Sequence, residues 1–429
     1  MQEPKPENLK ASAAPPTIKV GLVLPEDNRS VLKLRALEAV SVCGGAGKLP
    51  ISLAPQSEVE VAVVGGEVEL NAGGQKLRDR EIRLSPEKQH RLTPQSGIEV
   101  HDVIAGRKFH WRKEVALSFP GTLLITAENR HLVAVNEVSF EDYVTCVISS
   151  EMGPGCPKEF LMAQAVAARC WAWVFLRNKH RHPLFSVCND DDCQRYQGTS
   201  HLKPAVIEAS RGCAGEFLIS DAGFVTPAYY SKSCGGFTES ARYAFGFEVL
   251  GMQPVFDAPG AFAADLSSNE VFASFLRGTE CNHCYCSEAS VPAAELPNYL
   301  GAVDEHLHYF RWRKSIRQTA LEARLKEKLH LSDLSEVVNI APLKRGRSGR
   351  IYSLAINYMT HANKNMRRVI DGQYQIRELL DESFLLSSAF VVTRDSQGSF
   401  VLDGAGWGHG VGLCQIGAVA MALRGKGYK

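Results

Sequence analysis

Short runs of alternating apolar and polar residues dominate the first 135 residues of the chain. The runs 18–24 (IKVGLVL) and 59–70 (VEVAVVGGEVEL) have the period of two that is typical of half-buried strands. Gly65-Gly66 predicts a hairpin turn inside the second run. The segment GTLLITAENRHLVAVNEVSF repeats the pattern, with Glu128-Asn129 at the expected turn. We therefore predict a β-rich N-terminal domain over residues 18–134, preceded by a flexible linker over residues 1–17.

A continuous apolar run begins at Cys156 and indicates a buried helix. Pro157 suits the first helical position, because the N–H that it lacks would have no partner there. Glu159 complements the positive helix start, and the apolar run continues to about Leu176.

A second helix is expected from Thr319, where Thr319 and Glu322 match a capping box. Leu321, Leu325 and Leu329 would line one face of it. Residues 349–358 (GRIYSLAINY) predict a further strand, and the segment GAGWGHGVGLCQIGAVAMAL predicts a glycine-rich loop that enters a helix. Helices and strands mix without a regular βαβ alternation, which favours the α+β class with long buried helices and a substrate groove. We expect one catalytic region over residues 135–429, with a cysteine-containing, partly helical insertion at about 261–335.

Charge and composition exclude several kinds of partner. The chain has 429 residues, with 48 Lys and Arg against 47 Asp and Glu, so no overall field favours nucleic acid or an acidic membrane. No apolar run reaches the length of a membrane-spanning helix, and the opening MQEPKPENLKASAAPP lacks the apolar core of a signal peptide. A Pro/Ala/Lys linker of this kind often follows a cleaved signal or a lipid anchor.

Glu151 is the first candidate for chemistry. A lone Glu ahead of a helix is most often a surface charge that the helix dipole favours. Here Met152, the turn at Pro154 and the apolar helix would desolvate the carboxyl group and raise its pKa, as a general acid needs near neutral pH.

Two polar residues, Gln164 and Arg169, lie among small residues of the expected helix. A core Arg needs an acceptor, so Arg169 either holds a structural carbonyl or carboxylate or orients the site.

Two glycine-rich segments are candidate ligand-binding loops. One is SKSCGGFTES, and the other is GAGWGHGVG, where Trp407 and His409 lie on a backbone almost free of side chains. Such a backbone admits a ligand close to main-chain N–H groups while an aromatic face packs on it, which suits a sugar. No phosphate-loop ending is present. The candidate residues of the first segment are Ser231, Ser233, Gly235, Gly236, Thr238 and Glu239.

The segment KHRHPLFSVCNDDDCQRYQG is a metal candidate. His182, Cys188 and Cys193 supply zinc-type ligands, and Asp192 or His180 could complete a tetrahedron. The alternative is a disulfide or two free thiols.

The segment ECNHCYCSE adds Cys281, Cys284 and Cys286. Zinc, a disulfide, and a site shared with His306 or His308 remain open for it.

Four segments together resemble the SpoIID/LytB family of bacterial cell-wall proteins. They are FEDYVTCVISSEMGPGCPKEFLMAQAVAARCWAW, YYSKSCGGFTES, KRGRSGRIYSLAI and GAGWGHGVGLCQIGAVAMA, and they follow the family's order and spacing. The resemblance covers about Val135 to the end. It implies a lytic transglycosylase that cuts the MurNAc-GlcNAc bond of peptide-stripped peptidoglycan strands.

The same resemblance implies roles for single residues. The catalytic Glu of the family's EM pair falls on Glu151, and substrate binding falls on the two loops and on Gln415. The family's zinc-binding run falls on His182, Cys188, Asp192 and Cys193, with Asp192 where the second His is expected.

This chain departs from the family pattern at several positions. Met162 replaces a usual Lys, Cys234 replaces a usual Ser, and LCQIGA (Leu413 to Ala418) replaces the usual MSQYGA. These changes remove a charge and two hydroxyl groups, so the substrate preference is expected to differ.

One carboxylate suffices for the chemistry that the resemblance implies. Ordinary glycosidases use two. In a lytic transglycosylase, Glu151 would protonate the leaving oxygen and then accept the proton of the MurNAc C6 hydroxyl, which closes onto C1. The GG turn and the glycine-rich loop would stabilise the developing charge and bind the N-acetyl group.

Two other functions remain open. LytB-type members are described as modifiers of an N-acetylmuramoyl-L-alanine amidase, so the chain could be a noncatalytic glycan-binding partner of such an enzyme. It could also be a zinc-stabilised glycan-binding module without activity. In each case the zinc is expected to be structural, and the substrate implies an extracytoplasmic location in the cell envelope.

Overall fold

The computed structural model describes residues 17–45, 50–87, 92–107, 111–176, 179–249, 251–260, 265–300 and 308–429. The predicted linker lies almost wholly outside the described residues, as does His306. The described chain divides into two compact units. The N-terminal unit contains residues 17–154 and 164–227, and the C-terminal unit contains residues 155–163 and 228–429. The predicted β-rich region over 18–134 thus shares its unit with residues 135–154 and 164–227.

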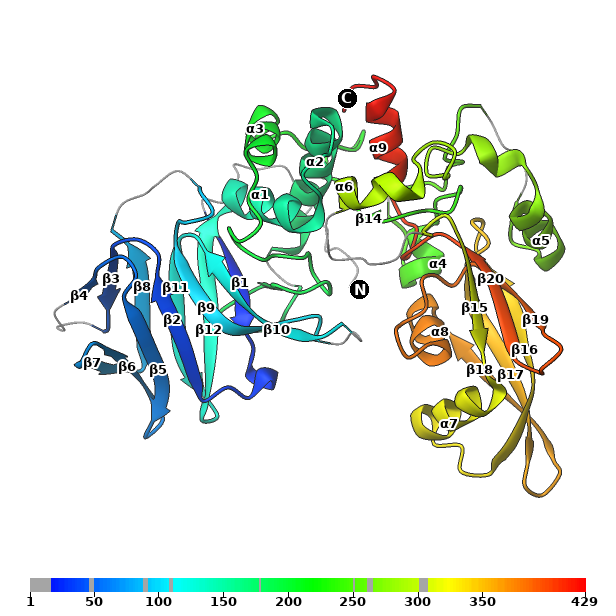
Figure 1. Ribbon diagram of the computed structural model, residues 1–429, viewed down its shortest axis with the longest axis horizontal. Coiled ribbons are helices and arrows are strands. Elements are labelled where there is room, and N and C mark those ends of the chain that lie inside the picture. Colours follow the sequence, from blue (N-terminus) through cyan, green and yellow to red (C-terminus); the bar gives the residue numbers. More distant parts are fainter. Residues whose placement is uncertain are drawn as a thin grey trace. The chain divides into compact units, whose positions relative to one another are not determined.

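Two sheets build most of the N-terminal unit (Figure 1). The larger sheet has the order β13-β1-β12-β11-β8-β3-β4, and only its β13–β1 pair is parallel. Its strands are β1 (Thr17–Val23), β3 (Val40–Cys43), β4 (Ile51–Leu53), β8 (Glu81–Pro86), β11 (Thr122–Glu128), β12 (His131–Ser139) and β13 (Val187–Cys188).

The second sheet is antiparallel throughout, with the order β10-β9-β2-β5-β6-β7. Its strands are β2 (Val31–Ala36), β5 (Glu58–Val64), β6 (Glu67–Ala72), β7 (Gln75–Asp79), β9 (Ile98–Ala105) and β10 (Lys113–Phe119). Strand β6 contacts β8 and β11 of the larger sheet, and β12 contacts β2 and β5. Alternate apolar residues of both sheets are therefore buried between them.

The two predicted hairpins are present. In the first, Val64 pairs with Glu67, and Gly65 and Gly66 have positive φ angles as a two-residue turn requires. In the second, Glu128 pairs with His131, so the turn lies at residues 129–130, one residue later than predicted.

Three helices complete the N-terminal unit, and they are α1 (Phe140–Glu151), α2 (Lys158–Phe175) and α3 (Pro204–Gly212). The first turn of α2 belongs to the C-terminal unit and the rest to the N-terminal unit. Helix α2 confirms the buried helix expected after Pro157. Helix α1 was not predicted. It begins at Phe140 because the Ser139 side chain accepts a hydrogen bond from the N–H of Asp142 at 3.1 Å. It ends at Glu151, which is therefore the last residue of a helix rather than part of a turn.

The C-terminal unit contains three small sheets. The first contains β15 (Arg311–Ile316), β20 (Phe400–Ala405) and β19 (Phe390–Arg394), in that order. The second contains β16 (Leu334–Arg345), β17 (Ile351–Thr360) and β18 (Asn365–Asp371). The third is the parallel pair β14 (Tyr230–Ser231) and β21 (Leu413–Cys414). Its other helices are α4 (Ala241–Phe245), α5 (Asn269–Arg277), α6 (Leu296–Leu300), α7 (Gln318–Leu329), α8 (Gln373–Leu380) and α9 (Gln415–Leu423). The described part of the expected insertion contains α5, α6, β15, all of α7 and the first residues of β16.

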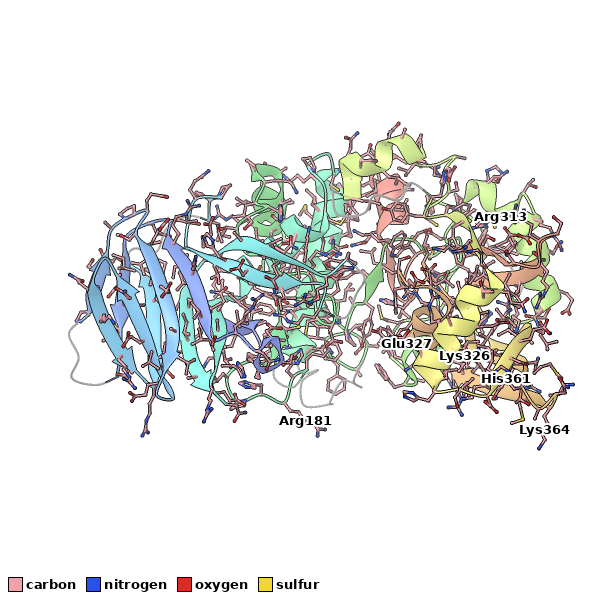
Figure 2. All side chains as sticks on the ribbon, turned by 60° about the horizontal axis from the view of Figure 1, so that its bottom comes forward. Arg181, Arg313, Lys326, Glu327, His361 and Lys364 are labelled. Carbon is pink, nitrogen blue, oxygen red and sulfur yellow. The ribbon has the colours of Figure 1, made fainter. Side chains whose placement is uncertain are left out.

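Helices α7 and α8 pack on β16 and β17 around an apolar core that includes Leu321, Leu325 and Ile376. Charged side chains such as Lys326 and Glu327 on α7 and Lys364 after β17 lie on the outside of this unit (Figure 2).

The capping box expected at Thr319 does not form. Helix α7 begins at Gln318 without a side-chain cap, and Glu322 instead accepts hydrogen bonds from the Val337 N–H at 3.0 Å and the Gln318 amide at 2.9 Å. The Glu322 carboxylate thus binds strand β16 and the first turn of α7 instead of capping the helix. The described chain combines helices with several largely antiparallel sheets and has a β-rich beginning, so the predicted α+β class is confirmed.

Candidate functional site

Glu151 ends α1, and only 9% of it is exposed. The last carbonyl groups of a helix have no partners within the helix. Lys203 Nζ meets this need, because it donates to Ser149 O at 3.3 Å and to Met152 O at 2.7 Å. A cation therefore closes the negative end of α1 around the backbone that carries Glu151.

The segment that follows β13 also fixes the end of α1. The Gln197 N–H donates to Ser150 Oγ at 3.1 Å, and the Tyr143 hydroxyl donates to Gln194 Oε1 at 3.2 Å. Burial raises the pKa of Tyr143 well above its ordinary value, and the charge of Glu151 adds to this effect. The Tyr143 hydroxyl group therefore stays neutral at physiological pH.

Arg169, on α2, is completely buried. Its guanidinium donates to both carboxylate oxygens of Glu141, at 2.9 and 2.7 Å, and to Glu216 O at 3.2 Å. These contacts match the structural alternative that the sequence left open for Arg169. Gln164, one helical turn and a half earlier, is buried as well.

His180, Cys188 and Cys193 form a compact cluster, which we call the N-terminal cluster. Their ligand atoms all lie within 4.8 Å of one another. The two sulfur atoms are 3.6 Å apart, and His180 Nε2 is 3.3 Å from Cys193 Sγ. The hydrogen bond with Cys193 lowers the pKa of Cys188 to about 6, with a further contribution from His180 and against the effect of burial. Two thiols, one of them an easily formed thiolate, and an imidazole are a donor set that fits zinc.

His182 and Asp192, the other residues predicted for this site, have different surroundings. His182 Nε2 lies 3.1 Å from Glu128 Oε2, and its ring stacks on Phe185. Asp192 Oδ2 accepts from Lys179 Nζ at 3.0 Å and lies 3.8 Å from His180 Nε2. Asp192 is thus beside the cluster, and His180 rather than His182 faces its thiols.

In the C-terminal unit, the GG turn (residues 231–239) and the glycine loop (residues 406–412) lie side by side. Ser233 and Trp407 exchange two backbone hydrogen bonds, at 2.8 and 3.3 Å, and the Glu239 N–H donates to Gly410 O at 2.8 Å. Strands β14 and β21 extend this contact in parallel. The structure therefore joins two motifs that are about 170 positions apart in the sequence.

Arg350 holds these two loops together, although the sequence patterns did not predict it as a site residue. It is fully buried, and its guanidinium donates to carbonyl oxygens on both sides. The acceptors are Gly408 O at 3.3 Å, Cys234 O at 3.1 Å, Ser233 O at 3.4 Å and Phe237 O at 3.5 Å. The signal that could have found it was its place in the quoted segment KRGRSGRIYSLAI.

The glycines of the glycine loop make room for this arginine. A Cβ atom at Gly410 would lie 2.4 Å from Arg350 Cζ, and one at Gly406 would lie 2.8 Å from Arg350 Nη2. Both glycines also have positive φ angles. The glycine loop thus has the predicted bare backbone, and the Arg350 guanidinium fills part of the space that side chains would occupy.

Glu239 is buried against the same arginine. Its carboxylate accepts from Ser348 Oγ at 2.6 Å and from the Ser240 N–H at 2.8 Å. Burial raises the pKa of Glu239 to about 6, although these hydrogen bonds and the charge of Arg350 act in the opposite direction.

The remaining candidates differ in how they are placed. Burial, together with the charges of Arg350 and Arg377, lowers the pKa of His409 to about 3, so its imidazole is neutral at physiological pH. Trp407 packs on Tyr309 and is partly exposed. Thr238 is tied to Val255 by three hydrogen bonds of 2.7 to 3.3 Å.

Two further predicted binding residues are buried near β21. Ser231 is 7% exposed and its Oγ has no hydrogen-bond partner among the described residues. Gln415, which begins α9, is 1% exposed.

Of the three cysteines of ECNHCYCSE, Cys281 and Cys284 lie near each other, whereas Cys286 lies with Cys234, Asp257 and Cys414. Cys281 Sγ points to Phe275 O at 3.8 Å and Cys284 Sγ to Gly236 O at 3.9 Å. His308 pairs with Glu288 at 3.0 Å.

Comparison with known proteins identifies two segments. Residues 128–219 match the family model described as Stage II sporulation protein (SpoIID), and this segment contains α1, α2, α3 and the N-terminal cluster. Residues 251–412 match a model described as a domain of unknown function (DUF8618). Residues 128–219 of the chain are therefore similar to the SpoIID family.

Two relatives extend the similarity beyond these segments. An uncharacterized protein of Brachyspira hyodysenteriae is 27% identical over 314 residues, which are 73% of this chain and 69% of the relative. An amidase enhancer of Bacillus subtilis is 23% identical over 293 residues, which are 66% of this chain but only 38% of the relative. Together with the family, these relatives support a role connected with the bacterial cell wall.

Within the described residues, no helix combines the length and the apolar composition needed to cross a lipid bilayer.

Proposed function

We propose that this protein is a lytic transglycosylase that acts on peptidoglycan glycan strands, with Glu151 as its general acid and base. The observation that carries the proposal is a single, nearly buried carboxyl group at the end of an anchored helix, within the segment matched by the SpoIID family. Lys203 holds the backbone carbonyl groups of Ser149 and Met152 on both sides of Glu151, and the Gln197 N–H holds the Ser150 side chain. These contacts give the preorganisation that proton transfer needs.

The proposed reaction needs only one carboxyl group. Protonated Glu151 gives its proton to the glycosidic oxygen as the bond to MurNAc C1 breaks, and GlcNAc leaves with a free hydroxyl group. The resulting carboxylate takes the proton of the MurNAc C6 hydroxyl while O6 bonds to C1. The product is a 1,6-anhydroMurNAc end, and Glu151 returns to its protonated form without consuming water.

Glu151 is only 9% exposed, so burial removes most of the water around its side chain. A general acid works best in a largely desolvated environment of this kind.

We propose that the GG turn and the glycine loop bind the glycan. Trp407 is partly exposed and offers an aromatic face for a sugar ring. Arg350 fixes the backbone of both loops, so their remaining polar groups would be preorganised. Because peptidoglycan lies outside the cytoplasmic membrane, this function places the protein in the cell envelope.

The first test compares the wild type, Glu151→Gln and the matched control Glu208→Gln on peptide-free glycan strands. Glu208 is an exposed residue of α3 in the same unit, so its substitution changes the charge equally at a position outside the proposed site. We expect about 100- to 10,000-fold slower formation of anhydro ends for Glu151→Gln and unchanged rates for Glu208→Gln. Activity of Glu151→Gln above a tenth of wild type would exclude the proposed role.

The second candidate function is that of an amidase modifier, and the similarity to the amidase enhancer of Bacillus subtilis favours it. In that case the same loops would bind glycan while a partner amidase removes the stem peptides. This function predicts no anhydro ends from the wild type alone, and faster amide cleavage when a cell-wall amidase is added. The increase would persist in Glu151→Gln.

A further inference from the structure

Four residues from four separate segments of the C-terminal unit converge on one buried point. They are Cys234 of the GG turn, Asp257, Cys286, and Cys414 immediately before α9, and we call them the C-terminal cluster. Their ligand atoms all lie within 4.8 Å of one another. The three thiols are between 2% and 6% exposed.

The distances within the cluster are those of a tetrahedral zinc site. With zinc–sulfur bonds near 2.3 Å and zinc–oxygen bonds near 2.1 Å, tetrahedral angles place two sulfur ligands about 3.8 Å apart and sulfur and oxygen about 3.5 Å apart. Cys234 Sγ lies 3.6 Å from Cys286 Sγ and 3.3 Å from Asp257 Oδ2. A disulfide would need about 2.05 Å between sulfur atoms, and it would leave the carboxylate unexplained.

Asp257 is the residue that a purely apolar or thiol-only core would not contain. No described Lys, Arg or His forms an ion pair with it, and its carboxylate instead faces the cysteines. A half-buried carboxylate without a cation is costly. A divalent metal ion bound by three thiolates and this carboxylate would supply the missing positive charge.

The backbone holds these ligands in place. The Asp257 N–H donates to Gly236 O at 3.0 Å, and the Tyr285 N–H donates to Asp257 O at 2.7 Å. On the other side, the Cys234 N–H donates to Cys414 Sγ at 3.2 Å.

Gly417 of α9 leaves the space that the carboxylate occupies. A Cβ atom there would lie 2.6 Å from Asp257 Oδ2. Cys234 and Cys414 are also two of the positions at which this chain differs from the family pattern described above. In the structure both side chains lie in the same cluster.

We propose that Cys234, Asp257, Cys286 and Cys414 bind a structural zinc ion. Four protein ligands close the coordination sphere, so the ion would not activate water. It would link the GG turn, the segments around Asp257 and Cys286, and the start of α9, and would thereby stabilise one of the two loops that Arg350 holds. This proposal is independent of the transglycosylase activity and of any metal in the N-terminal cluster.

The test is the zinc content of the full chain, measured by elemental analysis after purification without added chelator or metal. Cys286→Ser is expected to carry one zinc equivalent less than the wild type, whatever the N-terminal cluster holds. The matched control Cys284→Ser, a buried cysteine of the same segment outside the cluster, is expected to keep the wild-type content. Cys188→Ser separates any contribution of the N-terminal cluster.

A second measurement covers the case in which Cys286→Ser does not fold. Asp257→Asn keeps the shape of the side chain but weakens the oxygen ligand. We expect it to release zinc to a competing chelator about tenfold faster or more, since even outer partners of metal ligands have effects of this size. Equal zinc contents of the wild type and Cys286→Ser, equal release rates for Asp257→Asn, or a disulfide between two cluster cysteines in the purified chain would overturn the proposal.

Discussion

Each unit buries one arginine completely, and the two arginines are compensated in different ways. Arg169 in the N-terminal unit meets a carboxylate, Glu141, through two hydrogen bonds. Arg350 in the C-terminal unit meets mainly backbone carbonyl groups. Although burial acts to lower both pKa values, Glu141 raises the pKa of Arg169 above its ordinary value, whereas the pKa of Arg350 stays lowered.

The difference indicates what each arginine does. Arg169 joins the start of α1 to α2 and thereby supports the helix that ends at Glu151. Arg350 fixes the path of two loops, because carbonyl groups that bind one guanidinium must all face it. The shape of the proposed glycan-binding loops therefore depends on a residue that would not itself touch the glycan.

Removal of Arg350 is expected to have the largest effect on stability. Arg350→Met leaves several buried carbonyl groups and Glu239 without their cation, at a cost of about 3 to 5 kcal/mol in the free energy of unfolding of the C-terminal unit. Hydrogen exchange of the amides in residues 231–239 and 406–412 should rise accordingly. Arg350→Lys should rescue little, because an ammonium group cannot reach carbonyls on both loops. Unchanged exchange in Arg350→Met would contradict this role.

Removal of Arg169 should cost less. Glu141 has 36% of its side chain exposed, so water can solvate it in Arg169→Met. We expect a loss of about 1 to 3 kcal/mol, confined to the N-terminal unit and measured by hydrogen exchange in α1 and α2. A loss as large as that of Arg350→Met would show that the two compensations are equivalent.

The pH dependence of stability gives the smallest effect. Because the pKa of Glu239 is raised from 4.5 to about 6 by burial, the folded chain binds this proton more tightly than the unfolded chain. Glu239 therefore makes the free energy of unfolding fall by about 1 kcal/mol as the pH rises from about 4.5 to 6, out of about 2 kcal/mol over its whole titration. In Glu239→Gln this contribution should vanish, which urea unfolding at several pH values would detect.

The exposed residue Glu248, which pairs with Arg242, provides the control for that series. Glu248→Gln should keep the wild-type slope between pH 4.5 and 6. Identical slopes for Glu239→Gln and the wild type would mean that the burial of Glu239 does not control its ionisation.

Features that depend on neighbours in the sequence could be predicted. The two hairpins, helix α2 and the proximity of Cys188 to Cys193 follow from local patterns and spacing. The choice of His180 over His182 could not be predicted, because it depends on Glu128 and Phe185, which hold the second imidazole elsewhere.

Features that depend on distant segments were missed. Arg350 gains its role only when the GG turn and the glycine loop meet, 174 positions apart at the Ser233–Trp407 pair. The C-terminal cluster likewise joins residues spread from Cys234 to Cys414. Helix α1 was missed because its apolar residues continue directly from β12, so the sequence shows no break between strand and helix other than the Ser139 cap.

The central claim is tested most directly by digestion of peptide-free glycan strands with the wild type in water enriched in oxygen-18. If Glu151 directs O6 of MurNAc onto C1, the new ends will be lighter than a reducing end by one water and will contain no oxygen-18. New reducing ends that carry oxygen-18 would show that water is the nucleophile. That result would contradict the transglycosylase mechanism and require a second catalytic group.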